Sequence, residues 1–140
     1  RRRRARGLTR GASRARTWTA RGAPFVIDAR GKMLFLEDTG EAPYRIDRML
    51  TQMKLAGKFA ECAGVVWGTC TECTPKLSSF EVNLSMSDLI DEILGDIGKP
   101  VLAGLMFGHT KEKVTLPIGV MCEMDAAAKE VAIVESATVG

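Results

Sequence analysis

The chain has 140 residues and a formal net charge of +3, a length that suits one domain and is short for a two-domain enzyme. The charge is divided unevenly. Residues 1–24 carry nine arginines and no acid, whereas residues 25–140 hold the other 11 basic residues and all 17 acidic ones. No apolar stretch approaches the length of a membrane span, and the head lacks the apolar centre of a secretory signal. We therefore expect a cytoplasmic protein without a membrane anchor.

The arginine-rich head, residues 1–24, contains few aliphatic residues and shows no hydrophobic period. This composition predicts a disordered, low-complexity leader that buries nothing. Out-of-frame translation of a GC-rich gene is the interpretation we favour for it. A transit peptide and a tail that binds nucleic acid through phosphate contacts are the alternatives.

From Phe25 onward the chain resembles an ordinary globular domain. The apolar runs 25–27 and 33–36 predict two buried strands. Pro43 favours a helix start, and Gly57 favours its end. The predicted buried face of this helix consists of Ile46, Met49, Leu50 and Met53.

The second half continues with the same mixture of elements. Residues 64–68 and 101–104 predict strands, and Ser85 or Ser87 is expected to cap a second helix. The apolar stripe expected on that helix is Leu89, Ile90, Ile93, Leu94 and Ile97. Residues 119–125 and 130–135 alternate and predict a terminal hairpin. Intermixed strands and helices without an internal repeat indicate a single α/β layered domain.

Cys70 and Cys73 form a C-x-x-C motif, which serves redox exchange or half of a zinc site in other proteins. Zinc requires about four ligands, and the remaining soft ligands, Cys62, Cys122 and His109, have no regular spacing. Reduced, partly buried thiols are the better interpretation. The sequence thus predicts no metal and no cofactor.

Two other positions point to catalysis. Glu37 and Asp38 follow the apolar run 33–36, and His109, the single histidine, follows Gly108 in a loop. Side chains at such strand-to-loop junctions are often site residues on a rigid scaffold. A carboxylate and a histidine are two members of a nucleophile–histidine–acid triad, and the third is missing from the pattern.

Two segments carry a family resemblance. L-F-L-E-D-T-G-E-A-P-Y-R-I-D-R-M-L (residues 34–50) and G-H-T-K-E-K-V-T-L-P-I-G (residues 108–119) resemble the C-terminal domain of the LD-carboxypeptidases. These serine peptidases trim murein tetrapeptides and include the microcin-immunity peptidases. The resemblance covers residues 25–140 and implies a swivelling β/β/α-type layered domain.

The resemblance also implies an activity, the hydrolysis of an L,D-peptide bond by a Ser-His-Glu triad. Glu37 would be the acid and His109 the general base, while the serine would lie on an N-terminal domain expected before Phe25. Ser13 follows Gly11 and Ala12 in a faint echo of a G-x-S turn, but no apolar strand precedes it, so we interpret it as chance.

This chain is therefore expected to supply the acid and the base, to need an N-terminal nucleophile domain as partner, and to be inactive alone. The complete enzyme would be a homodimer. A truncated non-catalytic remnant and an interaction module with a nucleic-acid-binding basic tail remain alternative interpretations.

Overall fold

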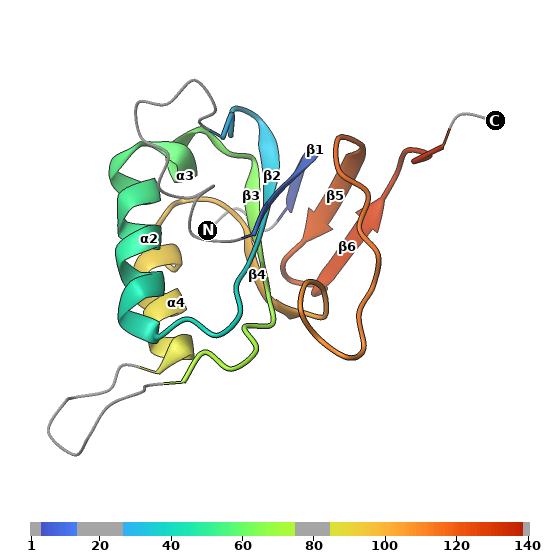
Figure 1. Cartoon of the computed structure of the whole chain (residues 1–140). Helices are drawn as coiled ribbons and strands as arrows, with labels where there is room; N and C mark the ends of the chain where they lie inside the picture. The colour runs from blue at the N-terminus through green and yellow to red at the C-terminus, as the bar shows by residue number, and fades with distance from the viewer. Residues whose placement is uncertain (1–3, 14–26, 75–84, 139–140) are drawn as a thin grey trace, which may run out of the picture.

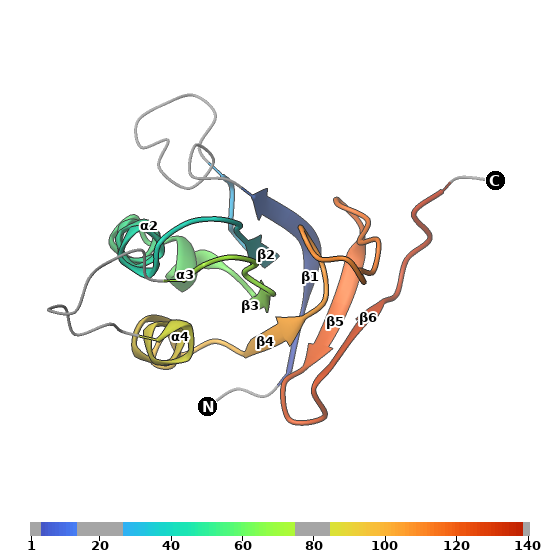
Figure 2. The same ribbon diagram turned by 60° about the horizontal axis from the view of Figure 1, so that its bottom comes forward.

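A computed structural model of the chain describes residues 4–13, 27–74 and 85–138. Its centre is a six-stranded sheet of order β4-β3-β2-β1-β5-β6 (Figure 1). The strands are β1 (Arg4–Ser13), β2 (Lys32–Glu37), β3 (Gly64–Gly68), β4 (Val101–Leu105), β5 (Met121–Asp125) and β6 (Glu130–Ile133). Strands β1 to β4 run parallel, and β5 and β6 join antiparallel beside β1. Figure 2 shows that the sheet curls, as in a half-barrel.

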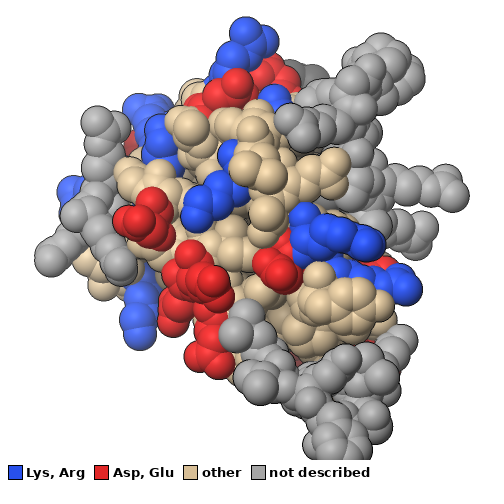
Figure 3. Space-filling model, turned by 90° about the vertical axis from the view of Figure 1, so that its left-hand side faces the viewer, with Lys and Arg blue, Asp and Glu red and all other residues tan. Residues whose placement is uncertain are grey.

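Within these ranges, three helices cover one face of the sheet (Figures 1 and 2). They are α2 (Pro43–Leu55), α3 (Lys58–Glu61) and α4 (Met86–Leu94). α2 and α3 connect β2 to β3, and α4 lies between β3 and β4, because parallel neighbours need crossover connections. Ser85 caps α4: its hydroxyl accepts a hydrogen bond of 3.1 Å from the Asp88 N–H. Acidic side chains gather on this helical side of the molecule (Figure 3), so its outer surface is polar.

The sheet separates two apolar cores. The larger core fills the space between the sheet and the helices, and its members include Leu34, Leu36, Ile46, Leu50, Val65, Trp67, Leu89 and Ile93. The smaller core lies on the other, concave face and consists of Met33, Phe35, Val66, Leu102, Phe107, Cys122 and Met124. Side chains of β2 alternate between the two cores, and the strand is almost entirely buried for this reason.

Strand β1 corrects the expectation of an unstructured leader. Residues 4–13 form an interior strand, paired in parallel with β2 from Leu8 to Ser13 and antiparallel with β5 from Arg4 to Leu8. The domain therefore extends to the N-terminal side of residue 25. The predicted disorder of residues 1–3 and 14–24 lies outside the described residues.

The sequence did not predict this strand because the inward side chains of β1 are small, not large and apolar. Ala5, Gly7 and Thr9 face the sheet interior, while the intervening positions, two of them Arg4 and Arg6, are exposed. A Cβ on Gly7 would lie 2.5 Å from the carbonyl oxygen of Gly31, so this approach needs glycine. The arginines pair with the neighbouring strand: Arg4 Nε lies 2.7 Å from Asp125 Oδ2, and Arg6 Nε lies 3.3 Å from Glu123 Oε1.

Most other predicted elements are confirmed: α2, β2, β3, β4, α4 and the β5–β6 hairpin lie where the sequence placed them. The α/β class is confirmed with them. Three details differ. Ile27 is buried but lies outside any strand, Ile97 follows α4 rather than belonging to it, and α3 was not predicted. Phe25 and Val26 lie outside the described residues.

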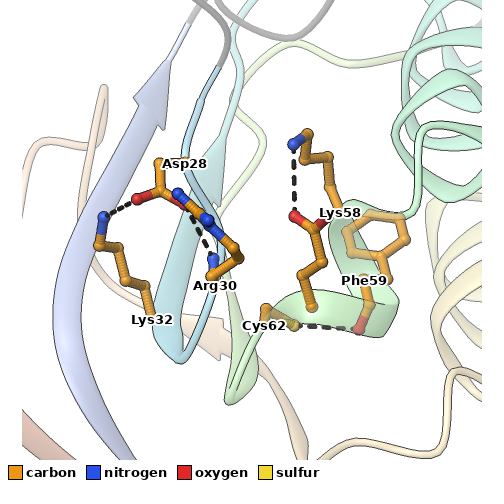
Figure 4. Close-up of polar contacts among 7 residues, drawn as sticks. Asp28, Arg30, Lys32, Lys58, Phe59 and Cys62 are labelled. Carbon is orange, nitrogen blue, oxygen red and sulfur yellow. Dashed lines mark hydrogen bonds and ion pairs between the residues drawn. The ribbon is translucent and has the colours of Figure 1, made fainter.

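Short polar contacts link the residues at the start of β2 and those around α3 (Figure 4). Lys32 and Arg30 both donate to the Asp28 carboxylate, at 2.7 and 3.0 Å, and hold the pKa of Asp28 below its usual range. The Cys62 thiol donates to the carbonyl of Phe59 at the end of α3. These contacts fix the chain where β2 and β3 begin side by side.

Candidate active site

Glu37 and His109 meet at the carboxyl ends of the parallel strands. Glu37 is the last residue of β2, and His109 lies in the loop that follows β4, 72 residues away. His109 Nδ1 is 3.0 Å from Glu37 Oε2. The Glu37 side chain is 5% exposed and the imidazole 45% exposed. The structure thus brings together the two residues that the sequence singled out, on one edge of the sheet.

Two glycines provide the space for this contact. A Cβ on Gly68, at the end of β3, would lie 2.9 Å from Phe107 Cζ and 3.1 Å from Glu37 Cβ. Gly108 has a φ of +90°, and a Cβ there would lie 2.6 Å from Glu37 Cδ. The backbone can therefore pass directly over the Glu37 carboxylate only because both positions lack a side chain. The sequence marked Gly108 as a turn residue, but gave no sign of the role of Gly68.

The hydrogen bond determines which nitrogen of His109 is free. With Glu37 ionised, Nδ1 carries the proton and donates to Oε2. Nε2 then keeps its lone pair on a half-exposed ring. This arrangement can accept a proton at Nε2 while the buried carboxylate stabilises the resulting imidazolium.

Thr71 links the segment that follows Glu37 to the loop that carries His109. Its hydroxyl donates to the carbonyl of His109 at 3.0 Å. Its own carbonyl accepts from the Gly40 N–H at 2.9 Å and from the Thr39 hydroxyl at 3.2 Å. Sequence analysis missed this residue, and no pattern could have revealed it because the contacts come from three separate segments.

Thr71 lies inside the C-x-x-C motif, and both cysteines of that motif are free thiols. Burial raises the pKa of Cys70 and of Cys73 above the ordinary value, and the same cause raises the pKa of Cys62 and of Cys122 to about 11. The four thiols are therefore protonated at neutral pH and are poor nucleophiles. Within the described ranges, no group of three or more His, Cys, Asp and Glu side chains is placed to hold a metal ion.

Asp38, the second carboxylate of the predicted pair, is also buried, at 4% exposure. It makes no hydrogen bond to His109; its Oδ1 accepts from the Thr39 N–H at 2.8 Å. The two adjacent acids of the motif therefore have different environments, and Glu37 is the one that contacts the imidazole.

The hydroxyls of Ser85, Ser87 and Ser136 make no hydrogen bond to the His109 ring. Ser85 and Ser87 bond to one another beside α4, and Ser136 donates to the carbonyl of Thr138. The backbone of Ser13 lies opposite Glu37 in the β1–β2 register. The described site thus presents an acid and a base without an assigned nucleophile.

None of the described helices is long and apolar enough to cross a membrane.

Comparison with known proteins places this geometry in a family. The family model described as the LD-carboxypeptidase C-terminal domain matches residues 6–124. A probable murein peptide carboxypeptidase of Bacillus subtilis is 39% identical over 112 residues, which are 80% of this chain and 34% of the relative. A putative carboxypeptidase of Streptomyces coelicolor is 40% identical over 124 residues, 88% of this chain and 38% of the relative.

Solved structures agree with the sequence relatives. A muramoyltetrapeptide carboxypeptidase from Oxalobacter formigenes superposes with a TM-score of 0.79 at 32% identity, covering 91% of this chain and 43% of that one. The matched residues begin in β1, which supports the inclusion of this strand in the domain. The chain spans about a third of the length of the curated relatives that it matches.

Proposed function

Because the chain belongs to the LD-carboxypeptidase family and matches its C-terminal domain, we propose that it supplies the acid and the base of a serine-type carboxypeptidase. The proposed substrate is a murein tetrapeptide, and the proposed reaction is hydrolysis of an L,D-peptide bond before a terminal D-amino acid. The observation that carries the proposal is the 3.0 Å contact between His109 Nδ1 and the buried Glu37 carboxylate.

In the proposed mechanism, His109 Nε2 removes the proton from a serine hydroxyl while the serine oxygen attacks the scissile carbonyl carbon. Glu37 holds the ring tautomer and stabilises the imidazolium. The imidazolium then returns the proton to the leaving amine, and the C–N bond breaks to release the D-amino acid. Water attacks the acyl-serine with His109 again acting as base, which releases the shortened peptide and restores the hydroxyl.

We assign the nucleophile to an N-terminal domain outside residues 1–140, as the family resemblance implies; the hydroxyls of Ser85, Ser87 and Ser136 bond to other partners than the imidazole. The oxyanion hole belongs to that domain as well. The 140-residue chain alone is accordingly inactive in this proposal. The complete enzyme acts as a homodimer on murein-derived peptides in the cytoplasm.

Reconstitution with a separate nucleophile domain tests the proposal. The N-terminal part of the Bacillus subtilis relative is added as a second chain, or is fused in front of β1 so that the relative orientation is restored. Release of a terminal D-amino acid from a murein tetrapeptide is then measured. We expect activity only in the combined protein.

Site variants identify the residues responsible. His109→Ala abolishes the restored activity, and Glu37→Gln lowers the turnover by about four orders of magnitude, because the amide keeps the shape but loses the charge and the tautomer control. Glu72→Gln, a change of an exposed carboxylate in the C-x-x-C motif, leaves the turnover unchanged. Activity that survives His109→Ala would show that this assignment is wrong.

A further inference from the structure

His109 lies on a long loop without regular secondary structure. Residues 106–120, between β4 and β5, form neither helix nor strand. Gly108, directly before His109, has a φ of +90°, and glycine allows the backbone to rotate at this position. The imidazole nevertheless meets the Glu37 carboxylate at 3.0 Å. A side chain is placed only as accurately as its backbone, so a base on such a loop needs a contact that holds the backbone.

Thr71, in the segment that follows β3, makes such a contact. Its hydroxyl donates to the backbone carbonyl of His109 at 3.0 Å, across 38 residues of sequence. The bond therefore joins the segments that follow two neighbouring strands of the sheet. Because Thr71 binds the backbone of His109 and not its ring, both ring nitrogens stay available, Nδ1 for Glu37 and Nε2 for proton transfer.

Thr71 is itself fixed to the segment that follows Glu37. Thr39 and Thr71 form an isolated parallel bridge. The Thr71 carbonyl accepts from the Gly40 N–H at 2.9 Å and from the Thr39 hydroxyl at 3.2 Å. The thiol of Cys73, which is 7% exposed, donates to the same carbonyl at 3.6 Å. These bonds hold Thr71 in place from two sides, so its hydroxyl can transmit the position of the Glu37 strand to His109.

We propose that Thr71 is a positioning residue for His109: its hydroxyl ties the His109 backbone to the segment after Glu37, so that Nδ1 faces the carboxylate. Two connections then join His109 to the Glu37 strand, a direct one through the ring and an indirect one through Thr71. The catalytic consequence rests on the proposed function, in which Glu37 keeps the tautomer that leaves Nε2 free. The geometric effect itself belongs to the isolated chain and is measurable without any peptidase activity.

The tautomer of His109 reports this position directly, and the chain contains a single histidine, so its ring signals are unambiguous. The 15N signals of the ring are recorded by NMR at alkaline pH, where the imidazole is neutral. In the unmodified 140-residue chain we expect the proton on Nδ1, bonded to Glu37. Thr71→Val and Thr71→Ala release the His109 backbone. We therefore expect both variants to lose the single Nδ1–H form and to show a mixture of the two tautomers.

Three further variants control for the loss of a hydroxyl as such. Thr71→Ser keeps the donor and should keep the Nδ1–H form. Thr110→Val removes a bond of 2.6 Å to the Glu112 carbonyl, inside the His109 loop. Thr39→Val removes one bond to the Thr71 carbonyl and leaves the bond from the Gly40 N–H. We expect both to leave the tautomer unchanged. Serine and alanine differ by one oxygen, so their comparison at Thr71 decides the question if the valine variant fails to fold.

An unchanged tautomer in Thr71→Ala would overturn the proposal, and so would a Thr71→Ser variant that behaves like Thr71→Ala. In the reconstituted enzyme, Thr71→Ala should lower kcat by about 10- to 100-fold with little change in KM, the effect of a misplaced catalytic group. Thr71→Ser should restore most of the turnover. If the reconstituted enzyme were inactive while the tautomers followed the expected series, the proposed function would fail and the positioning of His109 by Thr71 would stand. The two failures are therefore distinguishable.

Discussion

Gly108 has two separate reasons to be glycine, and both bear on the position of His109. Its φ of +90° is unfavourable for any residue with a Cβ, and a Cβ there would lie 2.6 Å from Glu37 Cδ. The first reason is shared with Gly119, which has a φ of +89° but nothing within 4 Å of the place that a Cβ would take. Substitutions at Gly108 and Gly119 therefore separate the cost of backbone strain from the cost of a collision with Glu37.

Gly119→Ala should lower the free energy of unfolding by about 1–3 kcal/mol, the cost of the strained backbone alone. Gly108→Ala should cost about 1–3 kcal/mol more, because the methyl group displaces the Glu37 carboxylate. Urea unfolding of both variants measures the difference. The His109 ring signals should shift in Gly108→Ala and stay in place in Gly119→Ala; equal stability losses would contradict the predicted collision.

The charge of Asp38 has a consequence for stability as a function of pH. Its pKa in the folded chain is raised above the ordinary 3.8, mainly by burial. The folded state therefore binds this proton more tightly, and the contribution of Asp38 to stability falls as the pH rises through the raised pKa. Below 3.8 the carboxyl is protonated in both states and the penalty disappears.

Asp38→Asn should accordingly have a higher free energy of unfolding than the unmodified chain near neutral pH. The difference should close as the pH is lowered through the raised pKa toward 3.8. Chemical unfolding at a series of pH values measures it. A variant that is less stable at every pH would mean that the carboxylate makes a stabilising contact that Asn cannot replace.

At the scale of the elements, β1 shows why an arginine-rich segment can lie inside a sheet. Thr9 is 1% exposed, and its hydroxyl donates to the Pro117 carbonyl at 2.7 Å and accepts from the Val120 N–H at 3.2 Å. The strand thus holds the far end of the loop that carries His109. It contributes backbone pairing and one buried hydroxyl rather than apolar bulk.

Thr9→Val keeps the shape of the side chain and removes both hydrogen bonds. We expect a loss of about 1–3 kcal/mol in the free energy of unfolding, because the Val120 N–H and the Pro117 carbonyl lose a buried partner. Thr51→Val, which removes an exposed contact with Asp47 on α2, should change stability by less than about 0.5 kcal/mol. Thermal or urea unfolding tests the pair, and a neutral Thr9→Val would show that the two hydrogen bonds of the Thr9 hydroxyl do not stabilise the fold.

The elements that could be predicted from the sequence are those with a regular pattern of apolar side chains. α2 has a stripe from Ile46 to Met53 behind Pro43, and β3 is a continuous apolar run. β1 could not be found in this way, because its inward residues are Ala5, Gly7 and Thr9 and most of its outward residues are arginines. Small residues that alternate with arginines form a pattern of period two that a hydrophobicity profile does not detect.

The site was predictable in part for a similar reason. Glu37 and His109 follow predicted strands and lie in distinctive motifs, so the sequence identified them as candidate site residues. The structure places them in contact. The residues that arrange them were not visible. Gly68 acts by the absence of a side chain, and Thr71 acts through bonds to segments about 30 and 40 residues away.

At the scale of the whole molecule, exposed apolar side chains gather on the segment that carries His109. Met106, Val114 and Ile118 are 52%, 49% and 53% exposed. Met106 and Val114 are neighbours, because the Val114 N–H donates to the Met106 carbonyl at 2.9 Å. Soluble domains rarely expose contiguous apolar patches unless another surface covers them. We expect this segment to be the surface on which the nucleophile domain docks.

In the absence of that domain, the 140-residue chain should self-associate through the same segment. Met106→Gln combined with Val114→Thr should lower the associated fraction measured by sedimentation at high protein concentration. Leu55→Gln is the matched control, since Leu55 is 72% exposed but lies at the end of α2 in the helical layer, and it should leave association unchanged. The double variant should also weaken binding of a separately supplied nucleophile domain, because both associations remove the same apolar side chains from water. If Leu55→Gln reduced association and the double variant did not, the docking surface would lie on the helices, and the His109 segment would be exposed for another reason.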